Sequence, residues 1–150
     1  MGNTYASLHY HFVFSTKNRE PWIHPDMEER IWEFLGGIAR QSGLKPIIVG
    51  GMPDHIHMAV GSPPTLAVSA VVQQIKGGSS RWIKDLAPGM RGFAWQDGYG
   101  AFAVSKSNLS ALTTYIQNQR EHHRVKTFKE EFVALLVRHG IEYEPRYLWD

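Results

Sequence analysis

Two histidines on one predicted strand are the residues best placed to bind a metal ion. His55 and His57 alternate with the apolar residues Ile56, Met58 and Val60. Because side chains two apart on a strand share a face, both imidazoles should point away from the apolar core. They would then lie close enough to bind one divalent cation. Spacing alone is also consistent with two ordinary surface histidines, so this interpretation needs a further ligand.

A tyrosine and a glutamine lie four residues apart in a later segment, 107–124, that is predicted to be helical. Tyr115 and Gln119 should therefore share one side of that helix. The amide oxygen of Gln119 could join the two histidines on a cation, with Tyr115 beside it. A cation there would favour the phenolate and neutralise charge on a phosphate, which suits attack on a phosphodiester. The alternative is a surface tyrosine beside a polar amide.

Composition restricts the chemistry and the setting of these residues. The 150-residue chain suits a single domain, 1–150, and its net charge of +2 is compatible with nucleic-acid binding without indicating it. It has no cysteine, which excludes disulfides, thiolate zinc sites and cysteine nucleophiles. We find no signal peptide and no apolar run of membrane-spanning length, so we expect a cytoplasmic protein without a membrane partner.

The elements expected to position the histidines and the tyrosine alternate between strands and helices. Period-two alternation predicts a strand over 5–15, with His9 and His11 on its polar side. Further strands are expected at 45–50, 55–60 and 95–104, and helices at about 25–43, 66–86, 107–124 and 128–139. We expect Gly77 and Gly78 to interrupt the second helix and to mark either a kink or a site where the backbone is closely approached.

The order of these elements, β-α-β-β-α-β followed by helices, predicts the fold class. It is α+β and ferredoxin-like, an antiparallel sheet with helices on one face. The other face is expected to be open, and the C-terminal helices carry the tyrosine.

Basic side chains between the predicted elements are candidates for contacts with DNA phosphates. They are Lys17, Arg19, Lys76 and Arg81. An ordinary mixed-charge surface would explain the same residues.

Taken together, these motifs resemble the IS200-like transposases (IS200/IS605 family), the single-tyrosine members of the HUH nuclease superfamily. The resemblance covers about residues 5–125. The matching stretches are Tyr10-His11 through Arg19, His55-Ile56-His57 after a Pro-Asp turn, Gln74–Gly77 with Ser79-Ser80, Trp95–Ser105, and the pair Tyr115 and Gln119.

The resemblance implies a DNA transposase that cuts and rejoins single-stranded DNA. Tyr115 would attack to leave a 5′-phosphotyrosine and a free 3′-OH, while His55, His57 and Gln119 would hold Mg²⁺ or Mn²⁺. The implied partners are hairpins at the ends of a mobile element and a second subunit in a homodimer. Active sites within one subunit or shared between subunits both fit, as do a mobile element and a domesticated relative.

Two further histidines could support this site. His11 and His123 are candidates to orient the metal ligands by contacting them on the side away from the cation. Ordinary surface or helix-capping roles are the alternatives. His122 or His123 could also replace Gln119 on the cation. A non-catalytic module that binds single-stranded nucleic acid on the same sheet remains a competing hypothesis. A paired-histidine phosphoesterase is disfavoured, because it would need two His-x-Thr/Ser motifs.

Overall fold

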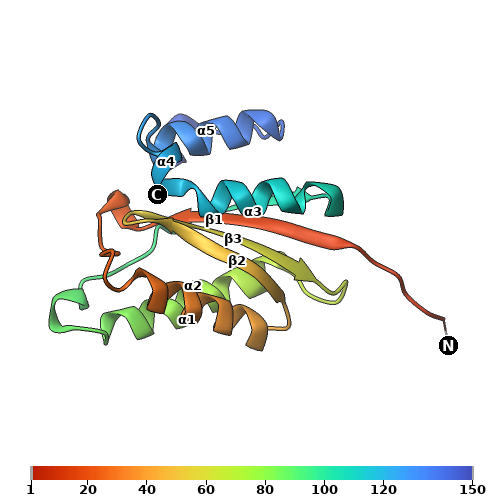
Figure 1. The fold of residues 1–150 in the computed structure, drawn as a ribbon, viewed down its shortest axis with the longest axis horizontal. Helices are drawn as coiled ribbons and strands as arrows, with labels where there is room; N and C mark the ends of the chain where they lie inside the picture. The colour runs from red at the N-terminus through yellow and green to blue at the C-terminus, as the bar shows by residue number, and fades with distance from the viewer. Residues whose placement is uncertain (1, 150) are drawn as a thin grey trace.

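A four-stranded antiparallel sheet runs through the middle of the molecule, with helices on both faces (Figure 1). This computed structural model describes residues 2–149. The strands are β1 (Leu8–Ser15), β2 (Lys45–Met52), β3 (His55–Ser62) and β4 (Gly100–Val104). They lie in the order β2-β3-β1-β4, so β1 and β3 are the central pair. The order of strands and helices confirms the predicted ferredoxin-like arrangement.

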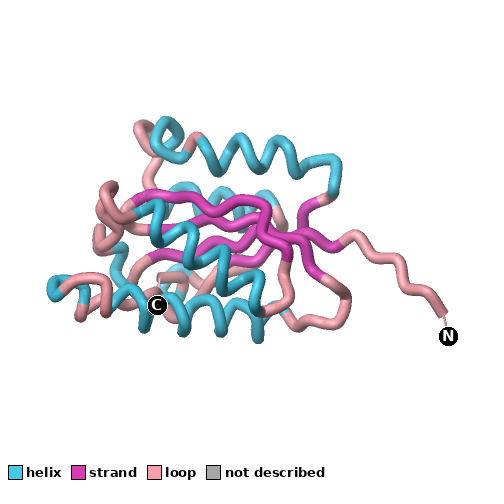
Figure 2. Tube along the Cα trace, turned by 60° about the horizontal axis from the view of Figure 1, so that its bottom comes forward, coloured by secondary structure: helices cyan, strands magenta, loops and turns pink. Residues whose placement is uncertain are grey.

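One face of the sheet is covered by α1 (Glu28–Gln41) and α2 (Val68–Lys84), as Figure 2 shows from that side. The alternation along β1 sends Phe12 and Phe14 into this layer, where both are fully buried. Apolar residues of both helices close over them, among them Ile31, Leu35, Val71, Val72, Ile75 and Ile83. This large apolar cluster is the main core of the protein.

The second face of the sheet was expected to be open, but three C-terminal helices cover it. They are α3 (Leu109–Gln117), α4 (Gln119–His122) and α5 (Phe128–Arg138). The physical reason is a second, smaller apolar cluster in which Val13 and Phe102 of the sheet pack against one side of α5. That side of α5 carries Phe128, Phe132, Leu135 and Leu136. A capping box between Thr127 and Glu130 starts α5.

The predicted helix over 107–124 is divided in two. Asn118 has φ −99° and ψ 27°, which ends α3 and lets α4 begin in a new direction. By contrast, α2 continues through Gly77 and Gly78 without interruption. A Cβ on Gly78 would lie 3.0 Å from Cδ1 of Ile38, so this glycine allows α1 and α2 to pack closely rather than kinking the helix.

The last strand is shorter than expected and begins at Gly100, while Trp95 forms only an isolated bridge with Thr16. Short 3₁₀ turns cover Lys17–Arg19, Pro88–Met90, Lys106–Asn108 and Pro145–Tyr147. Within residues 2–149, every helix is too short or too polar to cross a membrane.

Candidate active site

His55 and His57 project from the central strand β3 toward the C-terminal helices, with exposed fractions of 1% and 0%. Each imidazole is held from behind through its Nδ1 atom. Nδ1 of His55 lies 2.7 Å from Oδ1 of Asp54, and Nδ1 of His57 lies 2.8 Å from Nε2 of His11. The Nε2 atoms of both rings are therefore left to face the space under α4 and α5, the arrangement expected of oriented metal ligands.

The α4 segment brings Gln119 and His123 to the same space. The side-chain oxygen Oε1 of Gln119 lies 3.0 Å from Nε2 of His55 and 3.0 Å from Nε2 of His123. Nδ1 of His123 lies 2.7 Å from the carbonyl oxygen of Lys126, which fixes the ring at the end of α4. His123 thus lies at the end of α4 and faces the cluster, in a position that fits both the supporting role and the ligand role considered from the sequence.

A carboxylate that the sequence analysis did not single out lies at the centre of the site. Glu131 of α5 is 2% exposed, and its Oε1 lies 2.9 Å from Nε2 of His57 and 3.3 Å from Nε2 of His123. Its position in the sequence carries a signal, because it follows Phe128 by one helical turn and precedes Leu135 by another. An acidic residue within the apolar stripe of a helix indicates a specific buried partner.

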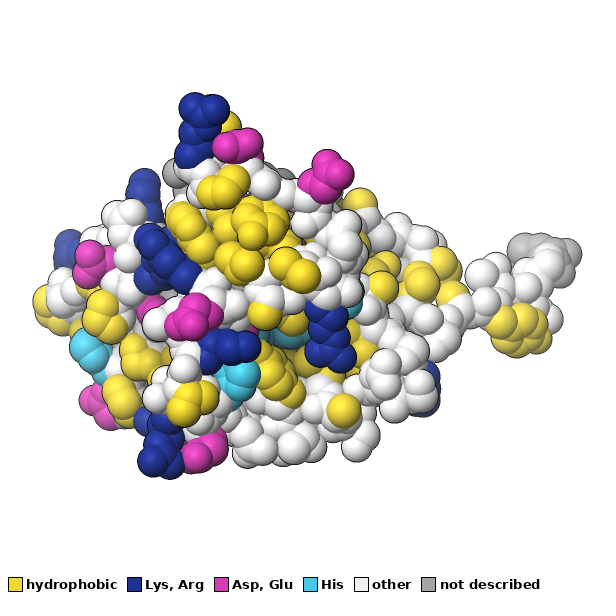
Figure 3. All heavy atoms as spheres, turned by 90° about the horizontal axis from the view of Figure 1, so that it is seen from above, with side chains coloured by type: hydrophobic (Ala, Val, Ile, Leu, Met, Phe, Trp, Pro, Cys, Tyr) yellow, Lys and Arg dark blue, Asp and Glu magenta, His cyan; other side chains and the backbone are white. Residues whose placement is uncertain are grey.

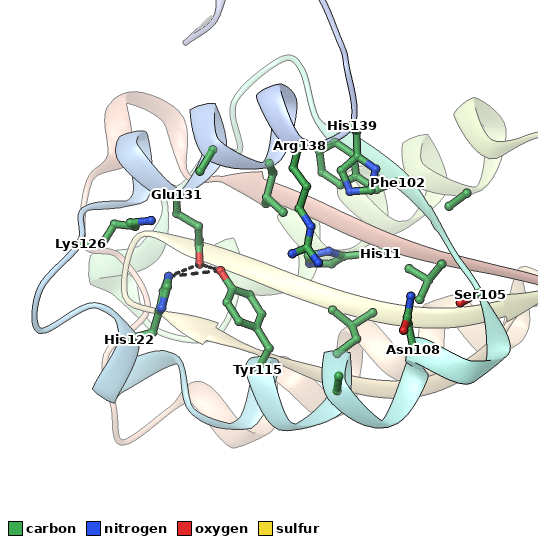
Figure 4. Close-up of a pocket in the computed structure, with 16 residues that line it drawn as sticks. His11, Phe102, Ser105, Asn108, Tyr115, His122, Lys126, Glu131, Arg138 and His139 are labelled. Atoms are coloured by element: carbon green, nitrogen blue, oxygen red, sulfur yellow. Dashed lines mark hydrogen bonds and ion pairs between the residues drawn. The ribbon is translucent and has the colours of Figure 1, made fainter.

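Tyr115 projects from α3 toward this carboxylate, and its hydroxyl donates a hydrogen bond to Oε2 of Glu131 (Figure 4). Nε2 of His122 lies 3.3 Å from the same hydroxyl. Burial and the contact with Glu131 raise the pKa of Tyr115 above its ordinary value. Without a cation the phenol is therefore neutral, so the site must gain positive charge before the oxygen can act as a nucleophile.

Burial also controls the charge of the surrounding groups. It lowers the pKa of His57, and, together with the neighbouring His57, it lowers the pKa of His11 well below the ordinary value. Burial alone would raise the pKa of Glu131, but hydrogen bonds from His123 and His57 outweigh it and keep that pKa far below its usual range. For His123 the hydrogen bond with Glu131 outweighs burial and raises the pKa. The site therefore contains an ionised carboxylate that faces both His57, whose neutral form is favoured by burial, and His123, whose protonated form is favoured by the carboxylate.

The donor atoms of this cluster could hold a metal ion. One atom each from His55, His57, His123 and Glu131 can be chosen so that all lie within 4.8 Å of one another. Two ligands about 2.1 Å from one ion lie at most about 4.2 Å apart, so only small movements are needed to close the site. The oxygen of Gln119 contacts two of the same imidazoles and can join them.

A cavity of about 570 Å³ opens beside Tyr115, between α3 and α5. Tyr115, His122 and Glu131 lie at one end of it, and Arg138 of α5 reaches into the middle (Figure 4). Figure 3 looks onto this side of the molecule, where Lys and Arg side chains lie on both sides of a hollow in which histidine is visible. The tyrosine is thus accessible from a pocket with basic walls, which suits an anionic substrate.

The predicted phosphate-contacting residues lie outside this cluster. Lys76 and Arg81 are on α2, on the opposite face of the sheet, and Nζ of Lys76 donates to the carbonyl oxygens of Gln96, Asp97 and Gly98. The guanidinium of Arg19 lies over the ring of Trp149. Lys17 is exposed in the turn after β1. Contacts of these four residues with DNA remain predictions.

Comparison with known proteins gives consistent results. The family model described as "Transposase IS200 like" matches residues 4–119. The ISDra2 transposase TnpA of Deinococcus radiodurans is 28% identical over 119 residues, which cover 76% of this chain and 85% of that protein. The transposase for insertion sequence element IS200 of Salmonella typhimurium is 25% identical over 131 residues, covering 83% of this chain and 85% of that protein.

Two solved structures resemble this fold. A crystal structure from Deinococcus radiodurans, of a protein described as a transposase, has a TM-score of 0.62 and 28% identity, and the match covers 79% of this chain and 96% of that one. The structure of a REP-associated tyrosine transposase bound to a REP hairpin has a TM-score of 0.60 and 15% identity. This match covers 82% of this chain and 73% of that one. The second likeness concerns the fold alone.

Proposed function

This chain belongs to the family of IS200-like transposases, which are DNA-processing enzymes, and on that premise we propose that it cuts and rejoins single-stranded DNA with Tyr115 as nucleophile. The resemblance noted in the sequence is thereby confirmed at the level of the family. The observation that carries the proposal is the position of the Tyr115 hydroxyl, at the edge of a buried His-Gln-Glu cluster and at the mouth of a cavity.

In the proposed reaction, the phenol oxygen of Tyr115 attacks the phosphorus of a DNA phosphodiester. A bond forms between this oxygen and phosphorus, the bond from phosphorus to the 3′ oxygen breaks, and the products are a 5′-phosphotyrosine and a free 3′-OH. The phenolic proton passes to the imidazole of His122, 3.3 Å away, and the departing 3′ oxygen takes up a proton from water. Because one phosphodiester replaces another, attack by a 3′-OH can reverse the step without an energy source.

The residues around Tyr115 fit the divalent cation that this reaction needs. His55, His57 and Gln119 would hold Mg²⁺ or Mn²⁺, which when bound polarises the phosphate and favours the phenolate. Asp54 and His11 keep the two strand imidazoles in the required orientation. Arg138, in the cavity wall, offers a positive charge to the DNA strand.

We further propose that the substrate carries a hairpin at the end of a mobile element and that the active enzyme is a homodimer. Family membership supports both proposals, and the hairpin proposal is further supported by a protein of similar fold that is bound to a REP hairpin. In the structure a single chain already brings Tyr115 against the His-Gln-Glu cluster, which supports a site formed within one subunit.

The test is incubation of the protein with single-stranded DNA from the flanks of its own gene, with and without Mg²⁺ or Mn²⁺, on a denaturing gel. The wild type should give a metal-dependent, protease-sensitive DNA adduct. Tyr115→Phe should give none while still binding the DNA. Tyr143→Phe, which removes the hydroxyl of a partly exposed tyrosine, is the matched control and should behave like the wild type.

An adduct of normal yield in Tyr115→Phe would overturn the nucleophile assignment. DNA binding by the wild type without cleavage under any metal condition would favour the competing hypothesis, a non-catalytic single-stranded DNA-binding protein.

A further inference from the structure

The carboxylate of Glu131 comes from a part of the chain outside the family match. That match ends at residue 119, whereas Glu131 lies in α5, which begins at Phe128. The helix nevertheless places this carboxylate in contact with both His57 and Tyr115. Figure 4 shows its contact with Tyr115. A residue outside the matched part of the chain thus lies at the centre of the candidate active site.

We propose that Glu131 is a protein ligand of the catalytic cation, together with His55, His57 and His123, and that this site prefers a transition metal such as Mn²⁺ or Co²⁺ to Mg²⁺. The inference rests on the proposed function only in that both place a cation at the strand histidines.

The first argument concerns charge. A buried carboxylate is costly unless a positive charge compensates it. Within residues 2–149, the side chains that form ion pairs with Glu131 are histidines alone, namely His55, His57, His122 and His123. A divalent cation bound between these imidazoles and the carboxylate would compensate the buried negative charge.

The second argument is geometric. A single oxygen, Oε1 of Glu131, faces the Nε2 atoms of three imidazoles, at 2.9 Å from His57, 3.3 Å from His123 and 3.5 Å from His55. Adjacent ligands of one ion, each about 2.1 Å from it, are about 3 Å apart. These contacts therefore match the separations within a coordination shell, and a metal can take the place of the protons now shared between them.

The chemistry of the donors gives the preference among metals. Imidazole nitrogen is a good ligand for first-row transition metals, whereas Mg²⁺ favours oxygen ligands and retains several waters. A set of three imidazoles and one carboxylate therefore selects against Mg²⁺. The amide oxygen of Gln119 can fill a further position without changing this balance.

The second carboxylate oxygen of Glu131 contacts the proposed nucleophile, Tyr115. Oε2 accepts the hydrogen bond of Tyr115, while Oε1 faces the histidines. With Oε1 on the cation, this bond would keep the phenol beside the metal. Glu131 would then be a positioning residue for Tyr115 as well as a ligand.

The experiment measures metal binding by the full-length protein without DNA. Co²⁺ binding is followed by visible absorption, and Mn²⁺ and Mg²⁺ binding by calorimetry. Wild type should bind Mn²⁺ at least about tenfold more tightly than Mg²⁺, and Glu131→Gln should weaken Co²⁺ and Mn²⁺ binding at least about tenfold, since even the loss of a group behind a ligand costs about 10–100-fold. Glu142→Gln removes an exposed carboxylate beyond the end of α5 and should leave affinity unchanged.

Equal Co²⁺ affinity and spectrum in Glu131→Gln and the wild type would overturn the ligand assignment, and tighter binding of Mg²⁺ than of Mn²⁺ would overturn the preference. Circular dichroism checks that each variant is folded. If Glu131→Gln does not fold, Glu131→Asp provides the test, because a retained but shorter carboxylate should shift the Co²⁺ spectrum.

The two proposals fail in different ways. Tyr115→Phe should keep the wild-type metal affinity while losing the DNA adduct. Metal-dependent adducts in the wild type combined with undiminished metal binding in Glu131→Gln would leave the nucleophile proposal intact and remove this one. Glu131-dependent metal binding without any adduct would do the reverse.

Discussion

The two faces of the sheet are built on different principles. The face under α1 and α2 is filled by apolar side chains from the strands and from both helices. The face under α3, α4 and α5 has only a small apolar cluster, around Phe102 and Phe132, beside a buried group of histidines, glutamine and glutamate. The strands are the same, so the difference comes from the alternate side chains that each strand presents.

Because of this difference, one face of the sheet contributes most of the folding stability and the other carries the candidate active site. Apolar burial is the dominant favourable contribution to folding, whereas buried polar groups at best recover the cost of removing them from water. The α1–α2 face therefore supplies most of the free energy of folding. The opposite face can hold imidazoles with lowered pKa values and an ionised carboxylate because the first face stabilises the sheet that carries them.

The largest effect is expected when two matched isoleucines, one on each side of the sheet, are replaced by alanine. Ile75 of α2 and Ile116 of α3 are both buried, at 1% and 2% exposure. Ile75→Ala should lower the free energy of unfolding by about 2–5 kcal/mol, because it opens a cavity in the main core. Ile116→Ala should cost less stability but should reduce the yield of DNA adduct, since Ile116 is next to Tyr115. Urea denaturation and the adduct assay measure the two effects, and a larger stability loss for Ile116→Ala would contradict the comparison.

An intermediate effect is expected where α3 packs on the sheet. A Cβ on Gly50 of β2 would lie 2.9 Å from Cγ2 and 3.1 Å from the carbonyl oxygen of Ile116, so Gly50→Ala must push α3 outward. We expect a stability loss of about 1–3 kcal/mol and a cleavage rate lowered about 100-fold, because Tyr115 is displaced.

The control for this variant is Gly37→Ala in α1, where the added carbon meets no other part of the protein within 4 Å beyond its own stretch of helix. It should raise stability by about 0.5–1 kcal/mol, because alanine restricts the unfolded chain and favours the helix, and it should leave cleavage unchanged. Normal cleavage by Gly50→Ala would show that the position of α3 does not limit the reaction.

The smallest expected effect is a pH dependence that belongs to the histidine face. His11 and His57 have folded-state pKa values below the ordinary 6.5, so the folded protein binds fewer protons than the unfolded chain as the pH falls below 6.5. Their contribution to stability is present above pH 6.5 and is lost on acidification, by at most about 1.4 kcal/mol per pH unit for each ring.

Urea denaturation at pH 7.5 and 5.5, with a chelator present, measures this loss. His11→Gln should lose less stability between the two values than the wild type does. His24→Gln removes an exposed histidine and should match the wild type. An equal loss in His11→Gln and the wild type would exclude His11 as a source of the pH dependence.

Local spacing was sufficient to predict part of the candidate site. The alternation around His55 and His57 showed which side chains share a face, and the four-residue step from Tyr115 to Gln119 brought these two to the histidines even though the helix ends at Asn118. The break itself could not be predicted, because it depends on how α4 packs rather than on a helix-breaking residue such as proline.

Local sequence patterns could not predict that α5 contributes a residue to the candidate site. His57 and Glu131 are separated by 74 positions, and their contact exists only because α5 packs across a face that the sequence suggested to be open. Period-two alternation indicates which side of a strand is polar, but it does not indicate whether a distant helix will cover that side. The apolar stripe of α5 and the carboxylate of Glu131 within it become informative only when Val13 and Phe102 are seen to form a matching apolar patch.

The strand order has a consequence for the energetics of binding. Because β1 and β3 are central, the backbone under His11, His55 and His57 is hydrogen-bonded to a neighbouring strand on both sides. The three rings are thus anchored on backbone that is paired on both sides before any ion or nucleic acid arrives. Capture of either requires little loss of conformational entropy at these residues, so the histidine side of the site is preorganised.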